Sequence, residues 1–186
     1  APEVEAAYTR ALMLCRQLGE TTQLFPSLLG LRLFYIARGE LRTARELGEQ
    51  LLGLAQKAQD PALLVEAHRA LGANLFSLGE LEPARAQLEQ ALALYDPRRH
   101  HLPAFFLEPG VLGLAFLALD LWLLGYPDQA RARSQAALAL AQTMSYPAAS
   151  AAALQFGAAV HLHCREAQPT REVAEAILAL AAEHGF

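Results

Sequence analysis

The sequence predicts an all-α protein built as a solenoid of stacked helical hairpins, and three observations lead to this fold class. A four-residue stretch of small and aliphatic residues begins at residues 11, 51, 91, 137 and 177, so the intervals are 40, 40, 46 and 40 residues. A repeat of this length is typical of solenoids. A glycine precedes three of the stretches by twelve residues. Apolar residues recur at helical spacing, without an alternating strand pattern.

The three glycines mark the corners of the predicted hairpins. Gly39, Gly79 and Gly125 are each followed, five and six residues later, by an Ala-Arg pair. Because glycine accepts the left-handed backbone that ends many helices, one helix should end and the next should begin at each corner. Both arms around Gly79 keep the helical period, with Leu64, Ala67, Leu71, Leu75 and Leu78 before it and Leu81, Ala84, Leu88, Ala91 and Leu92 after it.

The 186 residues divide into one repeat domain of successive helices. Residues 4–20 form a lone second-arm helix, and residues 19–26 form a short loop in which Thr21 or Thr22 caps the next helix. Hairpins follow at residues 25–59, 61–96, 111–144 and 147–185, with Pro61, Pro147 and Pro169 at helix starts. Neither end has a polar capping helix, so we expect this chain to be a fragment of a larger protein.

A longer connection at residues 97–110 accounts for the six extra residues in one interval. It holds two histidines, His100 and His101, and two aromatic residues, Phe105 and Phe106. Two interpretations stay open. The phenylalanines pack on neighbouring helices, or the segment contributes to a binding edge, as loops with aromatic and charged residues often do.

The unit around Gly79 resembles the tetratricopeptide repeat. With Gly79 at the fifteenth position of that repeat, Gly72, Ala84 and Ala91 fall on the three positions where the family places small residues. The resemblance spans the chain and weakens toward its ends. It implies a right-handed superhelix of antiparallel hairpins, in which the first-arm helices line the concave side.

The chain also departs from the family pattern. Arg32 and Leu51 stand at two of the small positions, and Arg165 replaces the glycine of the last corner. The period of 40 residues exceeds the usual ~34 and matches HEAT-like repeats of ~40–47 better. The small-residue pattern nevertheless favours the tetratricopeptide interpretation.

Three runs of residues are similar to the repeat regions of large bacterial signalling proteins, namely 38–54, 78–97 and 123–130. Those proteins join a nucleotide-binding ATPase, sometimes with a cyclase or kinase domain, to a long helical array. The resemblance implies a cytoplasmic regulatory protein of which this chain is the repeat module. None of the catalytic parts lies in this sequence.

The resemblance also implies a groove for a protein or peptide partner. Its surface would be formed by Leu33, Ile36, Arg69, Phe76, Trp122, Phe156 and His163, and further inward positions fall on Leu29, Glu66, Ala73, Ser77, Leu119 and Gln155. Aromatic anchors in such a groove would suit an amphipathic helix or an extended peptide. The alternative is that these residues form only the core between repeats.

Composition and motifs point away from catalysis, metals and cofactors. The sequence holds no phosphate-binding glycine loop, nucleophile elbow or zinc-protease motif. His161 and Cys164 share a helical face, but two ligands do not make a zinc site. Cys15 and Cys164 lie in distant repeats, so we expect two buried free thiols in a reducing cytoplasm. The net charge of -4 argues against nucleic-acid binding.

Residues 111–124 are almost wholly apolar and are interrupted by Asp120. The run is shorter than the ~20 residues of a membrane span, so it predicts a buried first-arm helix and no membrane insertion. Asp120 should then be paired, capped by a neighbour or facing the inner groove.

The sequence therefore predicts a protein-interaction scaffold that displays a rigid groove and performs no chemistry. Two alternatives remain. One is a sensor that binds a small ligand in the groove and gates an attached ATPase, and the other is a homo-oligomer formed through the uncapped end helices.

Overall fold

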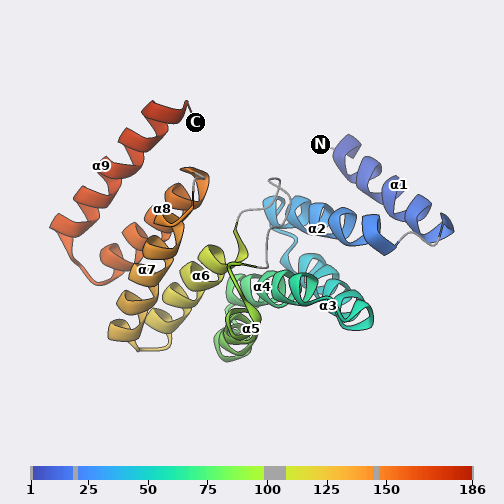
Figure 1. Cartoon of the computed structure of the whole chain (residues 1–186), viewed down its shortest axis with the longest axis horizontal. Coiled ribbons are helices and arrows are strands. Elements are labelled where there is room, and N and C mark those ends of the chain that lie inside the picture. Colours follow the sequence, from blue (N-terminus) through green and yellow to red (C-terminus); the bar gives the residue numbers. More distant parts are fainter. Residues whose placement is uncertain (1, 19–20, 99–107, 145–146, 186) are drawn as a thin grey trace.

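The computed structural model describes residues 2–18, 21–98, 108–144 and 147–185, and all regular structure in these ranges is helical. The helices follow an arc, with α1 and α9 at its two ends and α5 on its outer side (Figure 1). Their bounds are α1 Pro2–Leu18, α2 Thr21–Ala37, α3 Leu41–Ala58, α4 Pro61–Ser77, α5 Leu81–Leu94, α6 Pro109–Leu123, α7 Pro127–Gln142, α8 Pro147–His163 and α9 Ala167–His184. The predicted all-α fold class is confirmed.

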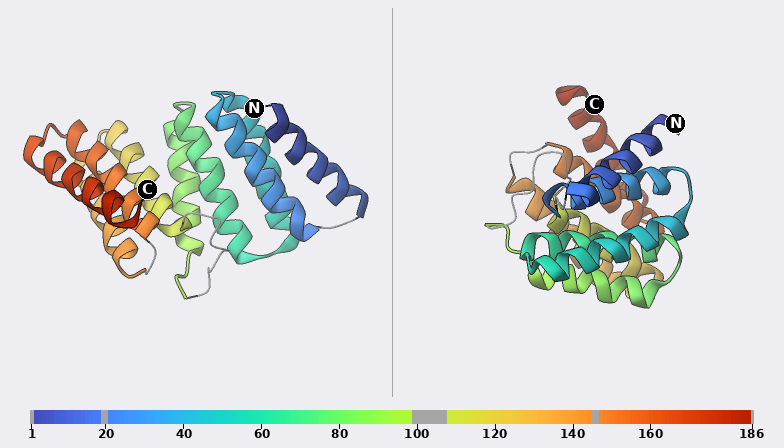
Figure 2. Two further views of the ribbon diagram at one scale, coloured as in Figure 1. Left: turned by 90° about the horizontal axis from the view of Figure 1, so that it is seen from above. Right: turned by 90° about the vertical axis from the view of Figure 1, so that its right-hand side faces the viewer.

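Each helix packs on the next one along the chain, and α4 also packs on α6 and α6 on α8. Figure 2 shows the resulting row of hairpins from above. The core between the arms is mostly Leu and Ala, and small residues allow the arms to approach closely. A Cβ atom on Gly72 of α4 would lie 2.7 Å from Cγ of Leu88 in α5. Ala84 and Ala91, at the other two small positions, are completely or almost completely buried.

The glycine corners have the predicted backbone. Gly39, Gly79 and Gly125 have φ angles of 75°, 77° and 90°. At the Gly79 corner the N–H groups of Gly79 and Glu80 donate to the carbonyls of Phe76 and Leu75, both at 2.9 Å, which closes the end of α4. Arg165 adopts the same left-handed conformation, with φ of 60°. The last corner is therefore built without glycine, at the cost of an unfavourable conformation for a residue with a Cβ atom.

The beginning of α2 corrects the prediction of a loop at residues 19–26, because the helix already begins at Thr21 and Pro26 lies inside it. Thr21 and Thr22 were predicted to cap a helix that follows the loop, but both are already residues of α2, so that prediction is wrong. A proline near the start of a helix removes one backbone N–H bond. Phe25 and Leu28 beside Pro26 are buried in a core cluster with Leu12 of α1, and this packing offsets the lost bond.

Three other helix starts were also predicted, and Pro147 is the first residue of α8, as expected. The carboxylate of Asp60 accepts hydrogen bonds from the N–H groups of Ala62 and Leu63, at 2.8 and 3.2 Å, so the predicted start at Asp60-Pro61 is confirmed. Pro169 is the third residue of α9 and not the first, because that helix begins at Ala167. The predicted packing role of Phe105 and Phe106 lies outside the described residues.

Arginines of the second arms connect each repeat to the next corner. Arg45 of α3 pairs with Glu80 at 2.7 Å, and Arg131 of α7 pairs with Glu166 at 2.7 Å. Between them, Arg85 of α5 lies 5.5 Å from the ring centroid of Tyr126, so an aromatic face replaces the carboxylate. These are the arginines of the repeated Ala-Arg pair, and they fix the spacing of neighbouring hairpins.

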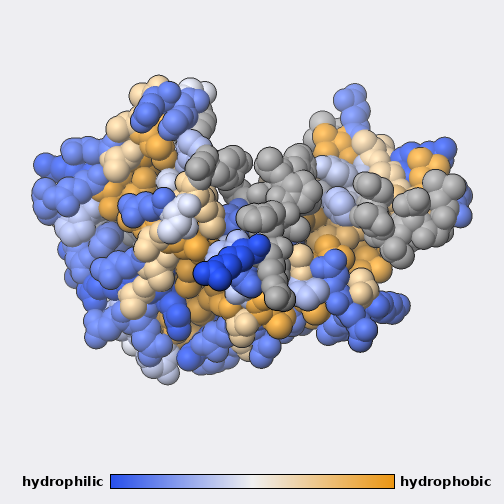
Figure 3. All heavy atoms as spheres, in the orientation of Figure 1, coloured by the Kyte–Doolittle hydropathy of each residue, from blue (hydrophilic) through white to orange (hydrophobic). Residues whose placement is uncertain are grey.

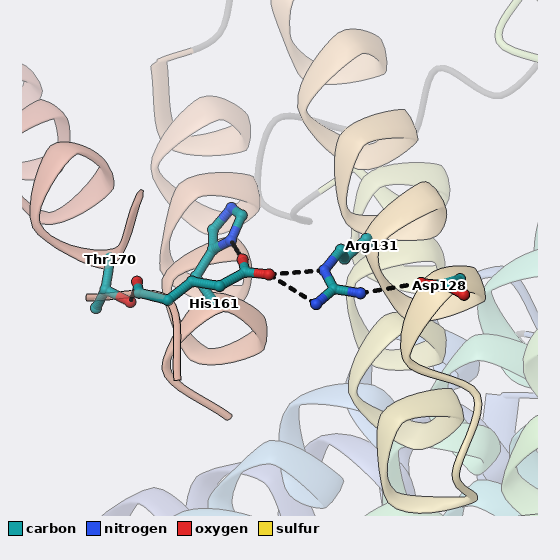
Figure 4. A network of polar contacts seen from close by, with 5 residues as sticks. Asp128, Arg131, His161 and Thr170 are labelled. Atoms are coloured by element: carbon teal, nitrogen blue, oxygen red, sulfur yellow. Dashed lines mark hydrogen bonds and ion pairs between the residues drawn. The ribbon is translucent and has the colours of Figure 1, made fainter. Parts of the chain in front are cut away.

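Figure 4 shows the last of these connections. Arg131 also pairs with Asp128 of its own helix at 3.0 Å, and the ring of His161 bonds to Glu166 at 2.6 Å. The hydroxyl of Thr170 donates to the Glu166 carbonyl. Hydrogen bonds from His161 and Arg131 lower the pKa of Glu166, which is therefore a charged structural link between α7, α8 and α9.

Candidate binding groove

The first-arm helices α2, α4, α6 and α8 together form a pocket of about 330 Å³ on the inner side of the arc. Figure 3 shows hydrophobic side chains in the middle of the face in view and hydrophilic ones along its outer rim. The wall is mainly apolar and is formed by Leu29, Leu33, Ile36, Ala73, Leu112, Phe116 and Phe156, with Arg32, Glu66, Arg69 and Ser77 as its polar members. A pocket with this composition, open at one side, suits a ligand with apolar groups.

Three charged residues lie at the base of the pocket. Arg69 and Glu66, one turn apart on α4, form a two-point ion pair in which Nε of Arg69 donates to Oε2 of Glu66 at 2.7 Å and Nη2 donates to Oε1. Arg32 comes from α2 and donates from Nη2 to the carbonyl of Ala70 on α4, at 2.8 Å. Its Nε and Nη1 atoms have no hydrogen-bond partner among the described residues.

The electrostatics of the two arginines differ because Glu66 is bound by only one of them. Arg32 is 1% exposed, and burial together with the neighbouring Arg69 charge lowers the pKa of its guanidinium to about 9, against the opposing effect of Glu66. Burial also lowers the pKa of Arg69, but the bound Glu66 carboxylate outweighs burial and raises it overall. The buried site thus holds two guanidinium groups and one carboxylate, and the carboxylate is bound by Arg69.

Aromatic rings connect the pocket to the neighbouring helices. The ring of Phe116 on α6 contacts Phe76 of α4 at 5.8 Å and Phe156 of α8 at 4.8 Å between centroids, both edge to face. Farther along, Trp122 stacks on His163 at 4.5 Å. The row of rings spans three repeats, so a segment bound here would contact several hairpins at once.

The structure brings together four of the seven residues proposed for the groove surface, since Leu33, Ile36, Arg69 and Phe156 all line the pocket. Phe76 lies behind Phe116, and Trp122 with His163 lies outside the pocket wall. Four of the further inward positions, Leu29, Glu66, Ala73 and Ser77, also line it.

Sequence reasoning missed Arg32, Leu112 and Phe116. Arg32 carried a signal, because a charged residue stood at a position where the repeat places a small one. Leu112 and Phe116 lie in an apolar run that gave no indication of which face is open.

Asp120 was expected to be paired, capped or facing the groove, and this was wrong. Its side chain is fully buried, is not part of the pocket wall, and neither carboxylate oxygen has a hydrogen-bond partner among the described residues. Burial, and next the nearby Glu82, raise the pKa of Asp120 to about 7. Helix α6 is thus apolar on all sides except for one buried acid.

Metal and membrane sites were searched in the part of the chain that the structure describes. No group of three or more His, Cys, Asp or Glu side chains there could hold a metal ion, and His161 is bonded to Glu166. No described helix is both long enough and apolar enough to span a bilayer. Both cysteines are free thiols; Cys15 is buried, whereas Cys164 is only partly buried and so differs from the prediction.

Solved structures with the same arrangement of helices are found at low sequence identity. BtubC (BKLC) from P. vanneervenii is 18% identical with a TM-score of 0.72, and the match covers 100% of this chain and 75% of BtubC. The apo form of RapI is 17% identical with a TM-score of 0.77, over 94% of this chain and 47% of RapI.

A putative kinesin light chain of Podosopora anserina with nearly identical TPR-like repeats is 18% identical with a TM-score of 0.67, over 99% of this chain and 88% of that one. No family model and no curated protein matches the sequence. The likeness lies in the fold, and it agrees with the period, the glycine corners and the small residues. The chain is a tetratricopeptide-like helical repeat solenoid.

Proposed function

We propose that this chain is a protein-interaction module that binds a segment of a partner protein in the groove between α2, α4, α6 and α8. The observation that carries the proposal is the apolar pocket, because its wall comes from four successive first-arm helices and continues into the aromatic row. Rigid aromatic and aliphatic side chains in a concave surface are what anchors of a bound peptide pack against.

The module would act through binding without chemistry. Ser77 is the hydroxyl of the pocket wall, and its Oγ donates to the Ala73 carbonyl of its own helix at 2.9 Å. No histidine or cysteine stands beside it in the described wall to activate it as a nucleophile. Glu66 is engaged with Arg69 in an ion pair, and Arg32 donates one hydrogen bond to the Ala70 carbonyl.

We further propose that the module belongs to a larger cytoplasmic bacterial signalling protein. The similarity of residues 38–54, 78–97 and 123–130 to the repeat regions of signalling ATPases supports this, and two free thiols fit a reducing compartment. The coding sequence upstream of Ala1 tests it. A Gly-x-x-x-x-Gly-Lys-Ser/Thr loop in front of the repeats supports the signalling context, whereas an upstream region of helical hairpins alone contradicts it.

A small-ligand sensor is a second candidate, and the size of the pocket favours it. A volume of about 330 Å³ lies at the lower end of the range of small-molecule sites, which runs from about 300 to 1,000 Å³. Self-association is a third candidate. The end helices expose large apolar side chains, since Leu178 of α9 is 70% exposed and Met13 of α1 is 46% exposed.

Selection from a displayed library of random peptides tests the groove. Leu33 lines the pocket and is 49% exposed, so Leu33→Gln removes an apolar contact without disturbing the core. We expect peptides selected on the wild-type chain to bind this variant at least about fivefold more weakly, because about 1 kcal/mol or more of apolar contact is lost.

Leu178→Gln is the matched control, since the same change is made on α9, which contributes no residue to the pocket wall, and it should leave affinity unchanged. If selected peptides bind both variants as well as the wild type, they do not use the groove. If selection yields no peptide while a metabolite binds in a 1:1 ratio, the sensor replaces the scaffold.

A further inference from the structure

Arg32 replaces a small residue at one repeated position. The residue seven places before each corner is Gly72 in α4, Ala118 in α6 and Ala158 in α8, but Arg32 in α2. Around this position the packing of the first arms also changes. Helices α4 and α6 are in backbone contact, as are α6 and α8, whereas no such contact joins α2 and α4 in the described chain.

The arginine side chain bridges this gap. It donates one hydrogen bond across it, from Nη2 to the Ala70 carbonyl, and it lines the pocket that the gap leaves open. A buried guanidinium normally has partners for its other N–H groups as well, since leaving them unpaired is costly. Here Nε and Nη1 have none among the described residues.

The charges of the pocket do not balance. Arg69 holds both carboxylate oxygens of Glu66, so the single acid of the pocket wall is already used. Among the described residues no acid forms an ion pair with Arg32, and a second guanidinium, that of Arg69, lies close to it. An uncompensated buried charge is destabilising, and an anion placed beside it would be held strongly because water is largely excluded.

We propose that this pocket binds the carboxylate of an Asp or Glu side chain in a partner protein, next to Arg32, while apolar neighbours of that residue pack on Phe116 and Phe156. This rests on the proposed function and adds the chemical class of the bound segment, an acidic residue flanked by apolar ones. The carboxylate supplies the acceptors that Nε and Nη1 lack. Charge complementarity thereby selects among the many apolar peptides that the wall alone would accept.

The test compares peptide selection on the wild-type chain with selection on Arg32→Met, which keeps an unbranched apolar side chain at this position and removes the charge. Wild-type peptides should be enriched in Asp or Glu beside Leu, Ile or Phe. Peptides from the variant should keep the apolar residues and lose the acid. Arg38→Met, which changes an exposed arginine after the end of α2, is the matched control and should keep the acid.

A titration then isolates the charge pair. One selected peptide and its copy with Glu or Asp changed to Gln or Asn are titrated against both chains. The amide copy should bind the wild-type chain at least about tenfold more weakly than the acidic peptide does. The affinities of the acidic peptide and its amide copy for Arg32→Met should differ by less than about twofold. Thermal unfolding provides the folding check, and the variant should melt at the same temperature as the wild type or higher. If it does not fold, the comparison of acid and amide on the wild-type chain decides alone.

The outcomes separate the two proposals. Peptides that depend on Leu33 but show no preference for an acid overturn the carboxylate inference and leave the interaction module in place. Failure to select any peptide overturns the interaction module itself. Equal binding of the acid and amide copies to the wild type overturns the inference, as does a tenfold preference that persists in Arg32→Met.

Discussion

At the scale of single residues, Arg32 and Asp120 stand out, because both are buried ionisable groups without an ion-pair partner among the described residues. Arg32 lies in the pocket wall, whereas Asp120 lies on α6 outside that wall. A buried carboxylate without hydrogen bonds is stabilised in its protonated form. The raised pKa of Asp120, about 7, follows mainly from this burial. Asp120 therefore links the stability of the solenoid to pH.

The sign of this linkage is fixed by the direction of the shift. Between pH 4 and 7 the folded chain keeps the Asp120 proton that the unfolded chain has lost, so the free energy of unfolding falls as pH rises. A shift of about three pKa units corresponds to about 4 kcal/mol. Asp120→Asn cannot ionise. We expect it to match the wild type in stability near pH 4 and to exceed it by up to this amount at pH 8.

Urea unfolding at several pH values checks the expectation. Asp128→Asn is a suitable control, because the Asp128 side chain is 97% exposed and its removal should alter the pH profile little. Parallel stability curves for the wild type and Asp120→Asn across pH 4 to 8 would show that Asp120 is ionised in the folded chain.

At the scale of helices and corners, local chemistry made much of the structure predictable. The glycine corners and the Asp60 cap carry signals that depend on a few neighbouring residues. The start of α2 was missed because residues 19–26 were predicted as a loop that ends at Pro26. The helix begins before Pro26, where Phe25 and Leu28 pack in one cluster with Leu12 of α1. That packing joins separate helices and cannot be read from local sequence.

Two glycines in helix interiors test the packing of the hairpins in opposite directions. At Gly72 an added Cβ would lie 2.7 Å from Leu88 Cγ and 3.2 Å from the Leu88 backbone nitrogen, whereas at Gly53 of α3 it would meet no atom within 4 Å. Gly72→Ala should therefore destabilise the chain by about 1–3 kcal/mol through overpacking. Gly53→Ala should stabilise it by about 0.5–1 kcal/mol, because alanine favours the helix.

Denaturant unfolding of the two variants beside the wild type gives both values. A stabilising effect of Gly72→Ala would mean that α4 and α5 are not in close contact at this position. Equal effects of the two substitutions would exclude the assignment of Gly72 to a small position of the repeat.

At the scale of the whole molecule, the period predicted the solenoid but not its pocket. Successive hairpins stack because each has an apolar face, and the intervals between repeats are visible in the sequence. The gap between α2 and α4 arises from the relative placement of two helices about 40 residues apart. In the sequence Arg32 is only a departure from the repeat pattern, whereas in the structure it lines the pocket at this gap. Residues such as Phe116 are recognisable as pocket residues only after the repeats are assembled.

The two ends of the solenoid are the surfaces through which the proposed self-association would occur. Helix α9 has no fully buried residue and exposes Leu178, and α1 exposes Met13 and Leu14. Because these two faces differ, contact between them joins molecules head to tail and does not close into a dimer. If the ends drive association, the average mass measured by light scattering should grow steadily with concentration. Leu178→Glu should then return the chain to a monomer, while Leu33→Gln in the groove should not. A constant monomer mass at high concentration would rule out end-to-end association and leave the groove as the surface that meets a partner.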